Sequence, residues 1–149
     1  MKITDYIFRF FAWGSLIGTT ILIGLVAYWL LWPYTPITFC SDPLPIINKV
    51  VSQGEPLQIR YHFKRYTTVK AVMTSHLICN GTYIAFEPIT GRIMDKGEHD
   101  YVSSTMVIPH HAPVGMCKIK CNFEYEINPL RTINVVVYTE PFEIIKGGP

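Results

Sequence analysis

The sequence predicts one membrane-spanning helix followed by an all-β domain, a two-sheet antiparallel sandwich of about seven strands. Three observations lead to this fold class. No Asp, Glu, Lys, Arg or His occurs from residue 10 to residue 41. Beyond that stretch, residues 57–64 and 117–127 alternate apolar and polar side chains, as half-buried strands do. No stretch of about ten residues there repeats its apolar side chains at the spacing of an amphipathic helix.

Residues 11–31 form the first element, an apolar run of the length that one bilayer crossing needs. At ~1.5 Å per residue the run extends about 31 Å, against a hydrocarbon core of about 30 Å. A cleaved signal peptide is the alternative, but the run exceeds the usual apolar core of ~7–15 residues and no small-x-small site follows it. Gly14 and Gly18 form a GxxxG motif, which predicts close helix–helix packing and a homodimer through this helix.

The charges on either side of the helix predict its orientation. Lys2 and Arg9 precede it, whereas the first charge after it is Asp42. By the positive-inside rule, residues 1–10 form a cytoplasmic tail, and the domain at residues 46–146 lies outside the cell membrane. Four prolines stiffen the connecting residues 32–45, which we expect to form an extended linker, and residues 147–149 form a C-terminal tail.

The outer domain supplies further strand signals besides the two alternating runs. In residues 57–64 the odd positions are apolar and face the core, while the even positions face water. Asn80-Gly81 is the preferred pair for a two-residue hairpin turn, although Asn80-Gly81-Thr82 also fits the N-glycosylation pattern. The remaining expected strands are residues 46–51, 69–79, 83–87, 101–108 and 133–142.

This pattern resembles immunoglobulin-like and fibronectin-type-III-like β-sandwiches. The turn Ile108-Pro109 to Val114-Gly115, followed by an alternating strand, is similar to the entry into strand F of such domains. The chain lacks a cysteine on the B-like strand and any tryptophan outside the membrane region, so the resemblance is to the superfold and to no particular family. The segments in the places of strands B, C, E, F and G are residues 57–64, 69–79, 101–108, 114–127 and 133–144.

The resemblance also implies a pairing for the cysteines. Cys79 ends the C-like strand and Cys117 begins the F-like strand, and these strands are antiparallel neighbours in such sandwiches, so we expect a Cys79–Cys117 disulfide. Cys117 and Cys121 lie ~13 Å apart along one strand and cannot bridge each other. We expect Cys121 to be a buried thiol, and free thiols at all four positions are the alternative.

A soft-metal site is a second alternative, because His110, His111 and Cys117 lie close together in the sequence. A layout of one membrane anchor and an immunoglobulin-like domain resembles the copper-insertion proteins of cytochrome oxidase. Those proteins are expected to carry a Cys-x-Cys pair, whereas this chain has Cys-x-x-x-Cys on an inward strand face. We therefore expect no metal and no cofactor, and keep a membrane-tethered copper chaperone as the alternative function.

The sequence excludes several classes of function. It carries no nucleophile elbow, HExxH, P-loop or dinucleotide motif, so we expect no enzyme. A net charge of +2 without a basic cluster argues against nucleic acid. We expect a module that contacts the lipid bilayer and binds or positions another, unidentified protein at the membrane surface, for example as a phage- or virus-encoded accessory membrane or virion component.

Overall fold

The computed structural model describes residues 3–31, 33–91 and 93–147. Lys2, Trp32 and residues 148–149, on which part of the expected orientation, linker and tail depends, lie outside the described residues. The chain divides into a helical unit and a β unit: Met1–Tyr34 with Asn128–Arg131, and Thr35–Ile127 with Thr132–Pro149.

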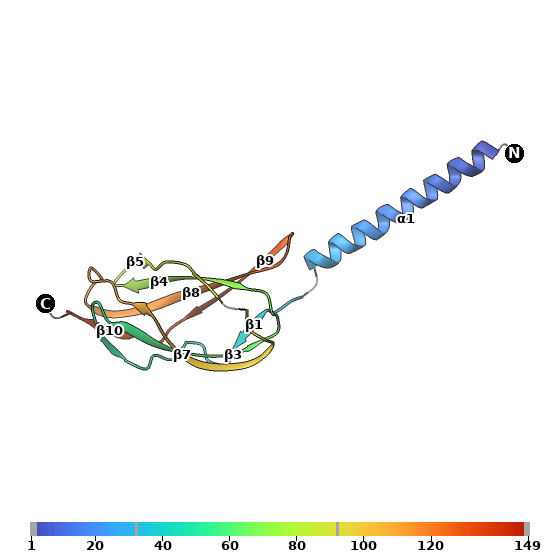
Figure 1. Ribbon diagram of the computed structural model, residues 1–149. Helices are drawn as coiled ribbons and strands as arrows, with labels where there is room; N and C mark the ends of the chain where they lie inside the picture. Colours follow the sequence, from blue (N-terminus) through green and yellow to red (C-terminus); the bar gives the residue numbers. More distant parts are fainter. Residues whose placement is uncertain (1–2, 32, 92, 148–149) are drawn as a thin grey trace. The chain divides into compact units, whose positions relative to one another are not determined.

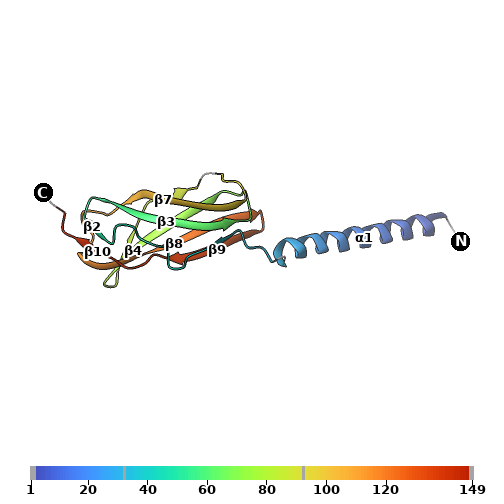
Figure 2. The ribbon, with the colours of Figure 1, turned by 90° about the horizontal axis from the view of Figure 1, so that it is seen from below.

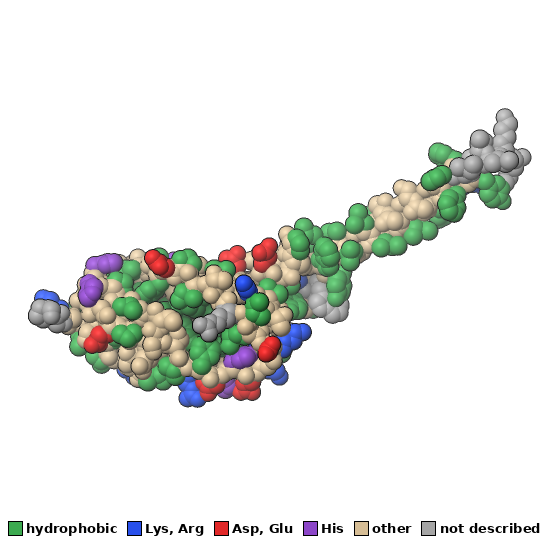
Figure 3. All heavy atoms as spheres, in the orientation of Figure 1, with side chains coloured by type: hydrophobic (Ala, Val, Ile, Leu, Met, Phe, Trp, Pro, Cys, Tyr) green, Lys and Arg blue, Asp and Glu red, His purple; other side chains and the backbone are tan. Residues whose placement is uncertain are grey.

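The helical unit contains one helix, α1 (Ile3–Leu31). Its segment Phe8–Leu31 has a mean hydropathy of 1.9 and is long and apolar enough to cross a membrane. Figure 3 shows hydrophobic side chains along the surface of this helix. A Cβ atom built on Gly14 or Gly18 would meet no heavy atom within 4 Å, so the face that carries the GxxxG motif is open. The homodimer through this motif stays a prediction.

The β unit contains two sheets (Figures 1 and 2). The smaller sheet has three strands in the order β1 (Ile37–Phe39), β3 (Pro56–Arg65) and β7 (Gly97–Val107). The path of the larger sheet is β2 (Val50–Ser52), β10 (Phe142–Ile145), β8 (Gly115–Asn128), β4 (Ala71–Cys79) and β5 (Thr82–Ala85). Two further strands complete this seven-stranded sheet: β6 (Ile89–Thr90) pairs with β4, and β9 (Arg131–Tyr138) pairs with β8.

The two alternating runs form strands with the expected faces. In β3, Leu57, Ile59, Tyr61 and Phe63 are buried, and the residues between them are half-buried or exposed. The expected hairpin between β4 and β5 is also confirmed, since Asn80-Gly81 makes a two-residue turn in which both φ angles are positive, 46° and 84°. Asparagine and glycine adopt that conformation more readily than other residues do.

From Thr35 on, the segment expected to be a linker, residues 32–45, is part of the β unit instead. Residues 37–39 form β1 on the edge of β3, and Leu44 is fully buried and bridged to Thr139. Bends at residues 40–43 lie between β1 and the bridge at Leu44, and the extended backbone on either side of them can pair with a strand wherever an N–H remains. The wholly antiparallel arrangement is corrected as well, because β2 runs parallel to β10.

The last expected strand, residues 133–142, is divided into β9 and β10. Pro141 lies in the gap and has no N–H to donate to a ladder. The hydroxyl of Thr139 accepts a hydrogen bond from the backbone N–H of Ile119 at 2.9 Å, so a side chain replaces a backbone partner beside the break. Thr139 is buried, and this bond satisfies its hydroxyl there.

Candidate functional site

A pocket of about 550 Å³ lies between the two sheets on the side of β7. Its volume is in the range of ~300–1,000 Å³ that is usual for ligand pockets. The segment after β6 contributes Ile93 and Met94 to the lining. The strands contribute aromatic and methionine side chains to the lining: Tyr61, Phe63, Met73, Tyr101, Phe123 and Tyr125.

Arg65 places a positive charge in the lining of this pocket. It continues the inward row of β3 and is only 4% exposed. Its guanidinium donates hydrogen bonds to the backbone carbonyls of Thr67, at 2.7 Å, and Val69. Among the described residues no carboxylate forms an ion pair with it, and its charge is stabilised by these two carbonyl dipoles and by the ring of Tyr125.

Two tyrosines lie within the electrostatic reach of Arg65. The guanidinium carbon is 6.0 Å from the centre of the Tyr125 ring. Burial raises the pKa of Tyr101 and of Tyr125, and the positive charge of Arg65 opposes that rise at both hydroxyls. The pocket thus combines apolar walls with a cationic end, which suits an apolar group that carries a negative charge.

The strand β7 forms one wall of the pocket and is also an edge strand. It pairs with β3, and in the described part of the chain no strand pairs with its other edge. Residues 101–107 (YVSSTMV) contain no charged residue, glycine or proline. Natural edge strands are protected by charged residues, proline or β-bulges. Glu98 and Asp100 stand in the first part of β7, and its register with β3 shifts between the partners of Leu57 and Ile59. Residues 101–107 themselves carry no charge and no proline, so this half of the edge has only the register shift as protection.

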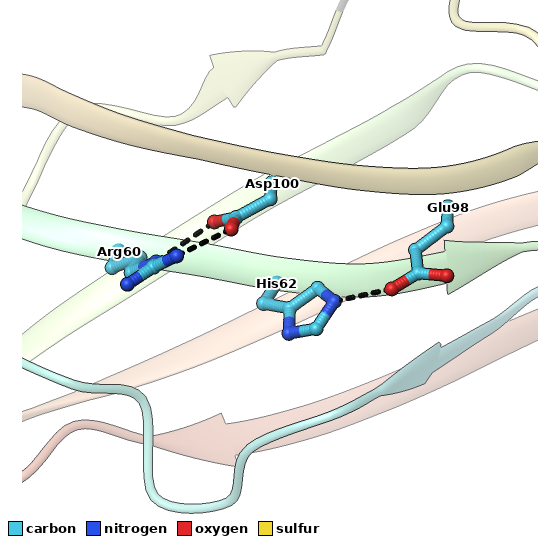
Figure 4. A network of polar contacts seen from close by, with 4 residues as sticks. All are labelled: Arg60, His62, Glu98 and Asp100. Atoms are coloured by element: carbon cyan, nitrogen blue, oxygen red, sulfur yellow. Dashed lines mark hydrogen bonds and ion pairs between the residues drawn. The ribbon is translucent and has the colours of Figure 1, made fainter.

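A polar network covers the outer face of the three-stranded sheet (Figure 4). Arg60 on β3 donates two hydrogen bonds to Asp100 on β7, at 2.9 and 2.5 Å. This contact lowers the pKa of Asp100 and raises that of Arg60. Beside it, the ring nitrogen Nε2 of His62 lies 2.6 Å from a carboxylate oxygen of Glu98.

Cys40 joins His62 and Glu98 in a group of three potential metal ligands. The thiol sulfur, a ring nitrogen and a carboxylate oxygen all lie within 4.8 Å of one another. Strand register builds this group, because the N–H of Cys40, directly after β1, bonds to the carbonyl of His62 at 2.9 Å. Among the described residues it is the one grouping of three such ligands.

The predicted cysteine pair meets in the larger sheet. Cys79 on β4 and Cys117 on β8 are directly opposite in register, and their sulfur atoms lie at disulfide distance, 2.08 Å. Cys121 is buried beside the hydroxyl of Ser75, with 3.8 Å between sulfur and oxygen. Burial raises the pKa of the Cys121 thiol to about 11.

The soft-metal alternative rests on three residues, His110, His111 and Cys117. His110 and His111 are exposed, and the His110 ring lies against Gly54, where a Cβ would be 2.4 Å from its Cε1 atom. Cys117 is buried, with its sulfur next to that of Cys79. A sulfur in a disulfide offers no thiolate to a metal, so the geometry gives this ligand set no support.

Sequence reasoning missed Arg65 and the cluster of Cys40, His62 and Glu98. Arg65 had a usable signal, since it stands at an odd position directly after the alternating run 57–64. The cluster had none, because its residues lie far apart in the sequence and meet only through the order β1-β3-β7.

No family model matches the chain, and no curated protein matches it either. Fold and site therefore define its class: a chain with one helix of membrane-spanning length and a two-sheet β unit.

Proposed function

We propose that the chain is a membrane-anchored, immunoglobulin-like module that holds another protein at the extracytoplasmic membrane surface. The anchor is α1, and the binding surface is the free edge of β7 together with the pocket beside it. The partner contributes a β-strand that pairs with β7 and places alternate side chains in the pocket.

The strand order supports the immunoglobulin-like assignment. The order β1-β3-β7 corresponds to strands A, B and E, and the order β2-β10-β8-β4-β5 corresponds to A′, G, F, C and C′. The parallel pair of β2 and β10 takes the place of the A′ and G pair. In the described residues no strand occupies the D position beside β7, and the proposed partner strand would fill it.

The unpaired edge of β7, uncharged over residues 101–107, is the observation that carries this proposal. An unpaired edge leaves alternate N–H and C=O groups without protein partners, and these groups can bond an incoming strand. Tyr101, Ser103 and Thr105 of this strand line the pocket. A strand added here would bury apolar side chains and complete a hydrogen-bonded ladder in one step.

Arg65 favours a partner strand with an acidic side chain at one inward position. A carboxylate there would meet a buried guanidinium whose charge no described carboxylate neutralises. Such charge-assisted hydrogen bonds are stronger and shorter than neutral ones. Any strand can form the backbone hydrogen bonds, so the contact with Arg65 would make the affinity for an acidic strand higher than the affinity for a neutral one.

The orientation of the anchor follows the charges. Arg9 lies close to the start of the apolar segment Phe8–Leu31, and the next charge along the chain is Asp42. We propose that the N-terminus is cytoplasmic and the β unit extracytoplasmic. A C-terminal reporter enzyme that is active only outside the cytoplasm should therefore report activity, and activity of a reporter restricted to the cytoplasm would contradict this orientation.

Photocrosslinking in cells tests the binding surface. A photoreactive amino acid at Thr105 should give a discrete adduct with one partner. Val102→Lys should abolish the adduct, because an edge lysine opposes strand pairing. Val136→Lys on β9 is the matched control, since Val136 and Val102 are 46% and 51% exposed and face outward on different sheets.

Two results would refute the proposal. One is the absence of any adduct from Thr105 in cells in which the full chain is folded. The other is an adduct that survives Val102→Lys and is lost with Val136→Lys, which would place the binding surface on the larger sheet.

A further inference from the structure

The outer face of the three-stranded sheet carries a second potential site, independent of the edge of β7. We infer that Cys40, His62 and Glu98 bind a divalent zinc-like cation. Their ligand atoms lie within 4.8 Å of one another, and each side chain projects from the same face of one sheet.

Register fixes the three side chains as neighbours. Side chains at cross-strand and diagonal positions on one face of a sheet lie within reach of one another. Cys40 bonds to the backbone of His62, and Glu98 is diagonal to His62 because Lys64 is its register partner. His62 and Glu98 thus stand on paired strands, and Cys40, in the bend directly after β1, is tied to the sheet by its backbone bond to His62, so binding requires little backbone ordering.

The chemistry of the donor set favours zinc. Zinc binds cysteine sulfur, histidine nitrogen and carboxylate oxygen, and a site with three protein ligands leaves a fourth position for water. Ligand atoms around tetrahedral zinc lie roughly 3.3–3.8 Å apart. The present 2.6 Å between Nε2 of His62 and the Glu98 oxygen would open by rotation of two partly exposed side chains.

The charge balance is also favourable. A thiolate and a carboxylate carry two negative charges together, which one divalent cation neutralises. The neighbouring carboxylate of Asp100 is already paired with Arg60 and does not compete. A single sulfur among nitrogen and oxygen ligands suits zinc better than Cu(I), which prefers thiolate and thioether ligands.

Alkylation of Cys40 in the full chain tests this site. The chain, in detergent micelles, is treated with N-ethylmaleimide with and without Zn²⁺, and labelling is followed by peptide mass spectrometry. Zn²⁺ should slow labelling of Cys40 at least tenfold, and a chelator should restore it. His62→Gln and Glu98→Gln should each remove this protection, whereas His76→Gln and Glu124→Gln on the other sheet should keep it.

A spectroscopic measurement complements the alkylation. Co²⁺ in place of Zn²⁺ should give a sulfur-to-cobalt charge-transfer band that disappears in Cys40→Ser. In Cys40→Ser, His62→Gln and Glu98→Gln, the affinity for Zn²⁺ should fall further than it does when a residue that only hydrogen-bonds to a ligand is lost, which costs roughly tenfold to hundredfold. The residues are partly or fully exposed, so each variant should retain the urea midpoint of the parent chain.

Three results would overturn the site. The first is labelling of Cys40 that Zn²⁺ does not slow. The second is protection that persists in both His62→Gln and Glu98→Gln, which would mean adventitious binding to the thiol only. The third is loss of protection in a His110→Gln/His111→Gln variant, which would assign the ion to the histidine pair.

Discussion

The two lateral edges of the β-sandwich differ in how the chain closes them. On one edge, which we call the sealed edge, residues 37–52 pair with both sheets in turn: β1 with β3, Ile46 with Ile59, Leu44 with Thr139, and β2 with β10. On the other, which we call the open edge, β7 pairs with β3 alone among the described strands, and a pocket of about 550 Å³ lies behind it.

The difference shows how similar strand patterns can serve stability or binding. At the sealed edge the crossing segment buries Leu44, Ile46 and Val51, at 0%, 4% and 1% exposure. At the open edge the inward-facing Tyr101 remains 42% exposed although it stacks on Tyr61 at 5.6 Å. Burial of this exposed apolar area and pairing of the free backbone groups would both be favourable, and a partner strand at the open edge would supply both.

The largest change in unfolding free energy is expected for loss of the Cys79–Cys117 bond, which lies in the larger sheet between the two edges. The Cys79→Ala/Cys117→Ala variant should lose roughly 4 kcal/mol of unfolding free energy, the chain-entropy value for closing a loop of 38 residues. Urea unfolding of the full chain in micelles, with and without reductant, measures it. Non-reducing peptide mapping must also yield a linked pair with Cys79 and Cys117; free thiols at both positions would disprove the bond.

The next effect compares the edges directly. Leu44→Ala at the sealed edge should cost about 3 kcal/mol, because it leaves a cavity in a fully buried site. Val102→Ala at the open edge should change the unfolding free energy by less than about 0.5 kcal/mol, as for exposed positions. Comparable losses for the two variants, measured by urea unfolding, would show that the edges do not differ.

The third prediction compares two arginines of β3, Arg65 in the pocket and Arg60 on the exposed face. Arg65→Met should cost about 2 kcal/mol, since it leaves the buried carbonyls of Thr67 and Val69 without donors. Arg60→Met, on the exposed face of the same strand, is the control and should cost less. An unchanged unfolding free energy in Arg65→Met would show that the guanidinium does not stabilise the fold, and would leave binding as its role.

Cysteine reactivity reports how tightly the interior is closed. Only the thiolate reacts, and with a pKa of about 11 the Cys121 thiol is about one part in a thousand ionised at pH 8. With chelator present, maleimide should label Cys121 at less than about a hundredth of the Cys40 rate, and this rate should rise until the pH nears 11. Equal rates at pH 8 would indicate an interior open to reagent.

The smallest effect is expected for the surface pair of Arg60 and Asp100. The pKa of Asp100 is lowered in the folded chain, so its stabilising contribution is present above the ordinary value of about 3.9. It is lost as the pH falls through the folded-state value. Asp100→Asn should therefore have a slightly lower urea midpoint than the parent at neutral pH, and the two midpoints should converge in acid.

The sequence predicts those parts of the fold that are encoded locally. The alternation in residues 57–64 and 117–127 and the turn Asn80-Gly81 each specify an element within a few residues. The sealed edge is predicted only in part. The expected strand 46–51 overlaps β2 at residues 50 and 51, whereas β1 lies in the segment expected to be a linker. Strands of three residues form only where a neighbouring strand pairs with them. Arg65 is not predicted as a buried residue because inward positions of a strand are usually apolar. The cluster of Cys40, His62 and Glu98 could not be predicted because it depends on which strands are neighbours in the folded sheet.

Hydrogen exchange along β7 tests the central claim most directly. In the purified full chain, those amides of residues 101–107 that do not bond to β3 should exchange fast, while those of β8, paired on both sides, should exchange slowly. When the crosslinking partner is bound, the fast amides of β7 should become protected and those of β5 should not change. Slow exchange throughout β7 in the purified chain, or protection by the partner at β5 with β7 unchanged, would contradict the account.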